Sequence, residues 1–354
     1  MREIDAENIA ELLAQLGWIA PGELLQARLL TGGVSNCVIQ VNRDSPRGGS
    51  IELASFVVKQ ARSQLAVDEP WFCSLERLER EVLVLKTCQQ LLERQHDEAP
   101  FPVGVPGLLA NDAEQHVYAM EAAGPGHRTW KEDLLAGRVD PLIATTCGWL
   151  LAVLHGCSWE DPQLAESIGD QQFFEDLRLQ PYYHQVAQRR PELSSQLAEL
   201  MELSRQPICL VHGDMSPKNL LVDEHRLLLI DFEVGHFGDP AFDLGFFQTH
   251  LILKALRAGA RAEEYWSLVA GFQEEYFTEL GKIRPQLALE QLAQRSLLHL
   301  GGCLLARVDG MSPVDYLDHA LQQAARRIGR DLLCRQIDSW DTVSQQVLTL
   351  AHDG

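Results

Sequence analysis

Residues 211–233 constrain the fold more than any other part of the sequence. They form a polar array, in which polar residues come before and after two short apolar runs. It reads VHGDMSPKNLLV and then, after the polar turn at 223–226, LLLIDFE. Two apolar runs on either side of a polar turn predict a β-hairpin. In an antiparallel hairpin the residue entering the first strand lies beside the residue leaving the second. Asn219 and Asp231 are therefore expected to be neighbours, although they are 12 positions apart.

The residues that this hairpin places together suit a magnesium ion. A carboxylate beside an amide oxygen is a hard ligand set, and Mg²⁺ takes its other ligands from water and phosphate oxygens. Asp214 lies five residues before Asn219, on the loop that enters the hairpin. Its side chain can face the metal position without binding the metal. Such a placement suits a base that orients an attacking hydroxyl. An ordinary turn ahead of a hairpin explains each residue alone, but not the whole array.

A glycine pair near the N-terminus suits a phosphate group. A strand-like run at 24–30 leads into Thr-Gly-Gly-Val-Ser-Asn at 31–36, and a second strand-like run follows. Glycines at a tight turn let backbone N–H groups approach a phosphate closely. Gly-Gly turns are common, and this one matches neither of the standard nucleotide-binding glycine motifs.

Lys59 lies inside an apolar strand-like run, Ser-Phe-Val-Val-Lys-Gln. A lysine in a strand usually faces solvent, but downstream of a phosphate-covering loop it becomes a candidate partner for phosphate oxygens. Such a lysine needs a carboxylate to position it. The helical pattern at 75–92 offers Glu79 and Glu81, which flank its apolar stripe on opposite sides, and periodicity does not choose between them.

The character of the chain changes near Gly126. Residues 1–123 mix strand-like runs with a helical pattern and a leading helix at 5–16, which predicts a small α+β lobe. Residues 124–354 predict a larger, mainly helical lobe that holds the polar array. The helices expected in this second lobe are 142–155, 171–189, 191–205, 261–280, 286–308 and 313–330.

Composition excludes several classes of function. The 354 residues carry 30 Lys and Arg against 50 Asp and Glu, a net charge of −20, so neither nucleic acid nor an anionic membrane is expected as a partner. The eight cysteines include no Cys-x-x-Cys pair, which argues against zinc and against a disulfide framework. The acidic N-terminus is unlike a secretory signal, and no run of about 18 uninterrupted apolar residues occurs. We therefore expect a cytoplasmic protein.

Together these motifs resemble the aminoglycoside phosphotransferase and choline kinase superfamily. The His-Gly-Asp-x4-Asn loop, the Ile-Asp-Phe-Glu segment and Gly-Asp-Pro-Ala-Phe-Asp-Leu at 238–244 match, and the resemblance covers residues 25–310. It implies a protein-kinase-like bilobal α+β fold, with an antiparallel sheet and a helix in the N-lobe and a mainly helical C-lobe. It also implies transfer of the γ-phosphate of ATP, with Mg²⁺, to a hydroxyl of a small molecule.

The resemblance also implies a role for each matching residue. Asp214 would be the catalytic base, and Asn219 and Asp231 would bind magnesium. Lys59 would hold the α- and β-phosphates, paired with Glu81, because the family's helix usually reads Arg-Glu before its apolar residues.

The remaining nucleotide contacts follow from the same resemblance. The phosphate-covering loop would comprise Gly32, Gly33, Ser35 and Asn36, and the adenine would bind backbone groups near Glu121 and Ala123. Some relatives use the position of Glu233 at the metal, whereas in others it only shapes the loop. Three nearby residues are expected to be structural: His155, His212 and Asp243.

Departures from the family of protein kinases point away from a protein substrate. Only eleven residues separate Asp231 from Asp243, which leaves no long activation segment to dock a peptide.

The competing interpretation is a nucleotide-binding pseudokinase that acts as a scaffold. Degenerate members of that kind typically lose the base or a metal ligand, and here both are present.

The acceptor is not defined by the sequence. Net acidity favours a cationic amino-alcohol or an aminoglycoside, whereas the layout also resembles the methylthioribose kinase and homoserine kinase branches. Arg307 and Asp309, at the end of a predicted helix, are candidate substrate contacts, although an arginine there also suits the helix dipole. No pattern in the chain defines an oligomeric state.

Overall fold

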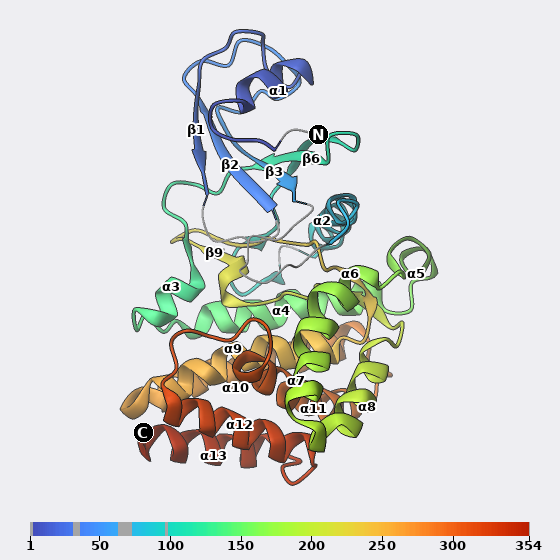
Figure 1. Ribbon diagram of the computed structural model, residues 1–354, viewed down its shortest axis with the longest axis vertical. Coiled ribbons are helices and arrows are strands. Elements are labelled where there is room, and N and C mark those ends of the chain that lie inside the picture. The colour runs from blue at the N-terminus through green and yellow to red at the C-terminus, as the bar shows by residue number, and fades with distance from the viewer. Residues whose placement is uncertain (1–2, 31–35, 63–72, 96–97, 354) are drawn as a thin grey trace. The chain divides into compact units, whose positions relative to one another are not determined.

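The computed structural model describes residues 3–30, 36–62, 73–95 and 98–353 (Figure 1). The chain divides into two compact units. The first comprises Met1–Gln90, Val105–His127 and Ile230–Glu233, and the second comprises Leu91–Gly104, Arg128–Leu229 and Val234–Gly354. Ile230–Glu233 therefore belongs to the first unit although it follows far later in the sequence. The division after residue 123 stays a prediction.

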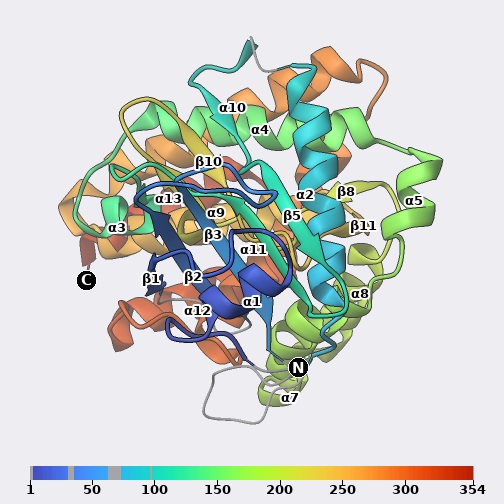
Figure 2. The same ribbon diagram turned by 90° about the horizontal axis from the view of Figure 1, so that it is seen from above.

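The first unit is built on an antiparallel sheet of five strands in the order β1-β2-β3-β6-β5. Its elements are α1 (Ile9–Gln15), β1 (Leu25–Leu29), β2 (Asn36–Arg43), β3 (Ser55–Ala61), α2 (Arg77–Glu93), β5 (Leu108–Asp112) and β6 (Val117–Glu121). Seen from above, α1 lies over the sheet (Figure 2). The antiparallel sheet and its accompanying helix confirm the fold expected for this lobe.

Helix α1 is shorter than the predicted span of 5–16. Asp5 accepts hydrogen bonds from the backbone N–H groups of Glu7 and Asn8, which fold the preceding residues into a turn. Ile9 and Leu13 are fully buried and pack in one core with the alternate residues of the sheet strands. A side chain on every second strand residue reaches this core, because successive residues of a strand point to opposite faces.

The second unit is mainly helical, as expected. Its helices are α3 (Trp130–Leu135), α4 (Pro141–Ser158), α5 (Pro162–Ile168), α6 (Gln172–Phe174), α7 (Gln185–Arg189), α8 (Ser194–Ser204), α9 (Ala241–Arg257), α10 (Ala262–Ile283), α11 (Leu289–Asp309), α12 (His319–Leu333) and α13 (Trp340–Asp353). A π-helical segment, η2 (Glu175–His184), and 3₁₀ turns η3 (Pro191–Leu193), η4 (Pro217–Asn219) and η5 (Gly259–Arg261) complete the helical part.

Short strands in this unit surround the polar residues at 212–219. They are β4 (Val103–Gly104), β7 (Arg128–Thr129), β8 (Cys209–Val211), β9 (Leu220–Val222), β10 (Leu227–Leu229) and β11 (His236–Gly238). The predicted hairpin is present: β9 and β10 pair antiparallel, with Leu220 opposite Leu229. A second small sheet pairs β8 with β11, so that strands both precede and follow the loop that holds Asp214.

Helix α4 is apolar because it is a core helix. By length and composition alone it would be able to cross a membrane, but 78% of its 18-residue window is buried inside the protein. It packs along α10, where the backbone of Phe272 lies against Gly148. The apolar surface that defines this helix is thus already covered by protein.

Paired glycines allow α11 and α12 to pack closely. A Cβ atom on Gly301 would lie 2.9 Å from the carbonyl oxygen of Gly329, and one on Gly329 would lie 2.9 Å from that of Gly301. Close helix packing, rather than ligand approach, therefore accounts for Gly301 in the middle of a helix.

The Gly301→Ala variant is expected to lose about 1–3 kcal/mol of unfolding free energy, because a backbone oxygen has to move to admit the methyl group. Gly281→Ala on α10 is the matched control. Its Cβ atom would meet only a leucine side chain, at 3.4 Å, so the gain in helix propensity should stabilise the protein slightly. Urea unfolding of both variants measures the change in unfolding free energy. Equal stability of the two would contradict the packing argument.

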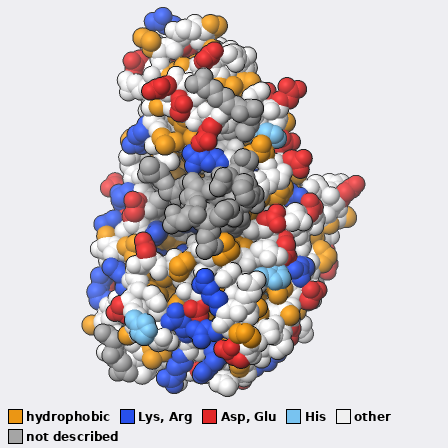
Figure 3. All heavy atoms as spheres, viewed as in Figure 1, with side chains coloured by type: hydrophobic (Ala, Val, Ile, Leu, Met, Phe, Trp, Pro, Cys, Tyr) orange, Lys and Arg blue, Asp and Glu red, His pale blue; other side chains and the backbone are white. Residues whose placement is uncertain are grey.

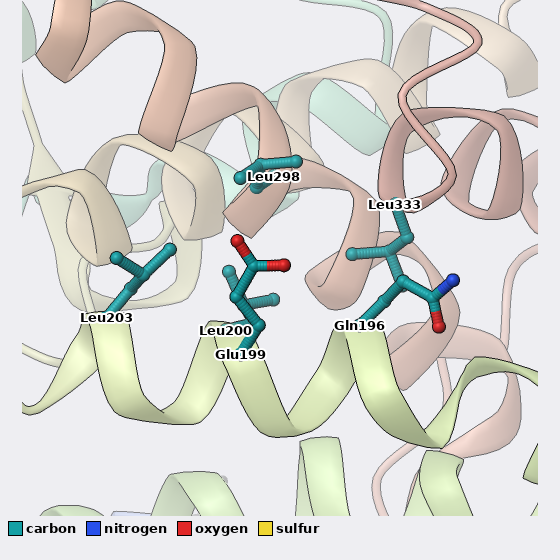
Figure 4. A pocket seen from close by; sticks show the side chains of 6 residues that line it. All are labelled: Gln196, Glu199, Leu200, Leu203, Leu298 and Leu333. Carbon is teal, nitrogen blue, oxygen red and sulfur yellow. The ribbon is translucent and has the colours of Figure 1, made fainter.

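A small pocket lies between α8, α11 and α12 (Figure 4). Its lining is Gln196, Glu199, Leu200, Leu203, Leu298 and Leu333, and its volume is about 10 Å³. Such a volume admits about one water molecule. It is a packing defect between helices and not a substrate site.

Candidate active site

In the first unit, Lys59 lies between two carboxylates. Its Nζ atom is 2.6 Å from Oε1 of Glu81 and 2.6 Å from Oδ1 of Asp231. Strand β3 supplies the lysine, α2 supplies Glu81, and the segment after β10 supplies Asp231. The structure thus brings together the lysine and Glu81, whereas Glu79 lies outward and is half exposed near His116.

Burial makes the charges of this cluster strongly interdependent. Burial alone would lower the pKa of Lys59, but the carboxylates of Asp231 and Glu81 outweigh it and hold that pKa well above its ordinary value. Burial raises the pKa of Glu81 to about 7, against the opposing pull of Lys59. The Tyr118 hydroxyl also donates a hydrogen bond to Glu81, at 3.0 Å. The lysine is therefore held charged and in a fixed position.

Glu233 lies near this cluster but is held by other groups. Its Oε2 atom accepts hydrogen bonds from Nδ2 of Asn36, at 2.8 Å, and from Nε of Arg77, at 3.2 Å. Arg77 is completely buried. The guanidinium and the amide thereby fix the position of Glu233, and Asn36 acts through its side chain in this contact.

Three carboxylates of the first unit offer ligand atoms within 4.8 Å of one another: Glu81, Asp231 and Glu233. Asp231 also has a backbone φ of 74°, a region that non-glycine residues seldom adopt. Strained backbone of this kind persists where the surrounding structure holds a functional side chain in place. Asp231 is therefore placed at some conformational cost.

In the second unit, the carboxylate of Asp214 is buried and fully engaged. Its Oδ1 atom lies 2.6 Å from Nη2 of Arg178, and its Oδ2 atom lies 2.9 Å from Nζ of Lys218. Asn219 donates from Nδ2 to Oδ2 and to the backbone oxygen of Asp214. The loop thus fixes the carboxylate by two cations and one amide.

Sequence reasoning missed Arg178. It lies on η2, where the sequence predicts one continuous helix over 171–189. Pro181 interrupts that helix, because proline lacks an N–H donor and clashes with the preceding turn. The result is a π-helical segment, a form often found at functional sites. Pro181 was the available signal for the irregularity, but nothing in the sequence connected Arg178 with Asp214.

The residues expected to be structural support the loop that holds Asp214. Asp243 accepts hydrogen bonds from the backbone N–H groups of His212 and Gly213, at 2.7 and 2.9 Å. His155 contacts Asp243 and the hydroxyl of Tyr276 from a fully buried position. Although burial would raise the pKa of Asp243, the hydrogen bond and charge of His155 lower it. These contacts confirm the structural interpretation of Asp243.

The residues predicted to contact adenine lie at the end of β6. The backbone N–H of Glu121 donates to the oxygen of Gly107, and its carboxylate accepts from the N–H of Gly107. Ala123 lies just beyond β6 and makes no backbone hydrogen bond with the described part of the chain. Gly32, Gly33 and Ser35 lie outside the described residues.

The two candidate substrate residues have different surroundings. Asp309 is held by two arginines, Arg190 at 3.0 Å and Arg326 at 2.9 Å, which favours a structural role. Arg307 donates from Nη1 to the hydroxyls of Tyr182 and Ser312, both at 3.1 Å. It has no carboxylate partner among the described residues.

Comparison with known proteins gives a consistent result. The sequence pattern of the phosphotransferase enzyme family matches residues 26–285. The chain is 26% identical to methylthioribose kinase of Yersinia pseudotuberculosis serotype O:3 (strain YPIII) over 378 residues, which cover 91% of this chain and 88% of the relative. It is 25% identical to methylthioribose kinase of Bacillus velezensis over 385 residues, with 96% and 91% coverage.

A solved structure agrees in fold. Choline kinase from Cryptosporidium parvum Iowa II is similar with a TM-score of 0.53 and 13% identity, covering 98% of this chain and 99% of that one. With the sheet of the first unit and the helices of the second, this likeness confirms the protein-kinase-like α+β fold. The family pattern spans most of the chain. The chain therefore belongs to the phosphotransferase enzyme family, and it is a small-molecule kinase that phosphorylates a hydroxyl group with ATP.

Proposed function

We propose that Asp214 is the catalytic base and that Lys59, paired with Glu81, holds the phosphates of ATP. The observation that carries this proposal is the buried ammonium group of Lys59, shared between Glu81 and Asp231 at 2.6 Å each. A lysine held in this way presents a fixed positive charge to phosphate oxygens. In the second unit, Arg178 and Lys218 fix the carboxylate of Asp214, which suits acceptance of the proton from the acceptor hydroxyl.

The reaction requires little covalent help from the protein. The acceptor oxygen attacks the γ-phosphorus, the bond between that phosphorus and the bridging oxygen of ADP breaks, and Asp214 takes the hydroxyl proton. Catalysis then rests on positioning and on charge stabilisation. Arg178 orients the carboxylate, and Lys59 offsets the negative charge of the phosphates.

The residues assigned to magnesium suit that ion. The Nδ2 group of Asn219 donates hydrogen bonds to the backbone and side chain of Asp214. The Oδ1 atom takes no part in these contacts, so it can serve as a metal ligand. Asp231 and Glu233 contribute carboxylate oxygens. Amide and carboxylate oxygens are the ligands that magnesium takes in kinases. When bound, the metal would neutralise charge on the β- and γ-phosphates.

The nucleotide would occupy the first unit. The 32–36 loop with Gly32, Gly33, Ser35 and Asn36 is assigned to the phosphates, and backbone groups near Glu121 and Ala123 are assigned to adenine. Of these last two, the N–H of Ala123 is the better candidate, because Gly107 already engages the N–H of Glu121.

The acceptor class includes sugar-like metabolites, amino-alcohols and aminoglycosides. The two methylthioribose kinases that match nearly the whole chain favour a sugar-like acceptor. We assign the protein to the cytoplasm, with neither nucleic acid nor membrane as a partner. The alternative, a nucleotide-binding scaffold without transferase activity, is disfavoured because Lys59, Asp214, Asn219 and Asp231 are all present.

A panel assay tests this function. Purified protein is incubated with Mg·ATP and a series of hydroxylated metabolites and aminoglycosides, and ATP consumption is measured. We expect acceptor-dependent consumption with one chemical class. Tight, magnesium-dependent ATP binding without turnover on any acceptor would favour the scaffold, and absence of ATP binding would exclude a kinase.

A further inference from the structure

A group of basic side chains in the second unit has no acidic partner in the part of the chain that the structure describes. This basic cluster consists of His250 and Lys254 on α9 and Arg307 in the last turn of α11. His250 is 8% exposed and Lys254 is 3% exposed. Within the described parts of the chain, no carboxylate pairs with any of the three. Buried charges are normally paired, bind a ligand or lose their proton, and this arrangement suits a counter-charge from outside the chain.

The cluster also presents polar atoms without partners. His250 Nε2, Arg307 Nε and the hydroxyl of Tyr316 are all buried, and none has a hydrogen-bond partner among the described residues. Among the described residues, Lys254 donates only to the backbone oxygen of His250, at 3.1 Å, and its Nζ lies 5.3 Å from the centre of the Tyr316 ring. Buried polar groups nearly always find partners in folded proteins, and those left over here all suit one acceptor-rich group.

The pKa shifts of Lys254 and His250 reflect burial and neighbouring positive charge. Burial, together with the nearby charges of Lys131, Arg307 and Arg257, lowers the pKa of Lys254 to about 7. Burial likewise lowers the pKa of His250 well below its ordinary value, assisted by Arg307 and Lys254. The three charged groups named here as lowering the pKa of Lys254 are all cations.

The cluster adjoins the catalytic carboxylate. Arg307 donates to the hydroxyl of Tyr182, and the guanidinium of Arg178 lies 5.8 Å from the centre of the Tyr182 ring. Arg178 in turn pairs with Asp214. Lys218, the second partner of Asp214, is close enough to lower the pKa of His250. The path from the cluster to Asp214 therefore runs through a few contacting side chains of one unit.

We propose that the basic cluster binds an anionic group, a carboxylate or a phosphate, of the acceptor whose hydroxyl Asp214 orients. The assignment of the acceptor rests on the proposed function of Asp214. It reverses the preference for a cationic acceptor that follows from the net charge of −20. The acidic excess is not evenly spread: Lys and Arg side chains gather over the C-terminal helices on the face shown in Figure 3. Local charge around the site, rather than the total, selects the ligand.

The kinetic test compares three pentose acceptors that differ in charge: ribose, ribonate and ribose 5-phosphate. The wild-type protein should prefer one of the two anionic acceptors to ribose. Lys254→Met should raise KM for that acceptor about 10- to 100-fold, the range expected for a lost charged hydrogen bond, and leave ribose turnover within about twofold. Preference for ribonate or for ribose 5-phosphate identifies a carboxylate or a phosphate.

The matched control is Lys282→Met on α10, which removes the same charge from an exposed lysine paired with Glu279. It should behave as wild type with all three acceptors. The preference for the anionic acceptor should also weaken as the pH rises above the pKa of Lys254, because the lysine then loses its proton. Equal use of charged and neutral acceptors by wild type and Lys254→Met would overturn the proposal.

A binding measurement decides the proposal even if no pentose is phosphorylated. Inorganic phosphate is titrated by calorimetry into protein saturated with Mg·ADP, which fills the nucleotide site. Wild type and Lys282→Met should bind phosphate, whereas Lys254→Met should bind it about 10- to 100-fold more weakly. Equal binding by all three proteins would refute the anion site. Failure of the catalytic assignment would instead appear as normal phosphate binding together with turnover that does not depend on Asp214.

Discussion

Asp214→Asn is expected to lower the rate of phosphoryl transfer by about 10²–10⁴-fold, the contribution typical of a positioned base. Asparagine keeps the shape of the side chain but has one accepting oxygen instead of two, so it can still accept from Arg178 or from Lys218 and Asn219, but not from both sides. Affinity for Mg·ATP should stay near that of wild type, because the residues assigned to the phosphates and to adenine belong to the first unit and Asn219 itself is unchanged. Steady-state turnover and calorimetric ATP binding measure the two effects separately.

Asp223→Asn is the matched control for this variant. Asp223 lies in the turn of the same hairpin and accepts hydrogen bonds from the N–H groups of His225 and Arg226. Asparagine accepts the same bonds, so turnover should be unchanged. If Asp214→Asn retained turnover close to that of this control, another group would have to be the base.

Lys59→Met is expected to lower the unfolding free energy by about 3–5 kcal/mol, as loss of one partner from a buried ion pair does. Glu81 would then be buried without its cation, and it lies within 4.8 Å of Asp231 and Glu233. Affinity for Mg·ATP should fall about 10- to 100-fold, because a charged contact to phosphate is lost. Urea unfolding and ATP titration measure these two effects.

A second variant separates charge from packing in this cluster. In Lys59→Met/Glu81→Gln the uncompensated carboxylate is also removed, so part of the lost stability should return while ATP affinity stays low. A double variant no more stable than Lys59→Met would show that the lysine contributes through its packing and not through the ion pair.

The sequence predicted the parts of the site that depend on local pattern. Two apolar runs and a polar turn predicted the β9–β10 hairpin. The family motif predicted the structural role of Asp243. The choice between Glu79 and Glu81 did not follow from periodicity, because both flank the same apolar stripe. It depends on how α2 is rotated against the sheet, which is a property of tertiary packing.

Other parts of the site were beyond sequence reasoning for the same physical reason. Arg178 reaches Asp214 because a π-helical segment replaces a regular helix, and the sequence gives no measure of that rotation. The basic cluster joins α9 to the end of α11, which are far apart in the chain. Total charge pointed to a cationic ligand, whereas two buried basic side chains and one partly buried arginine, with no acidic partner among the described residues, point to an anion.

The most direct test of the central claim follows the γ-phosphate itself. Wild type and Asp214→Asn are saturated with ATP that carries a radiolabelled γ-phosphate, and an acceptor chosen from the panel is added. We predict that wild type transfers the label to the acceptor hydroxyl, and that Asp214→Asn binds the nucleotide equally well but leaves the label on ATP. Transfer by Asp214→Asn at a rate close to that of wild type would contradict the assignment of Asp214 as the base.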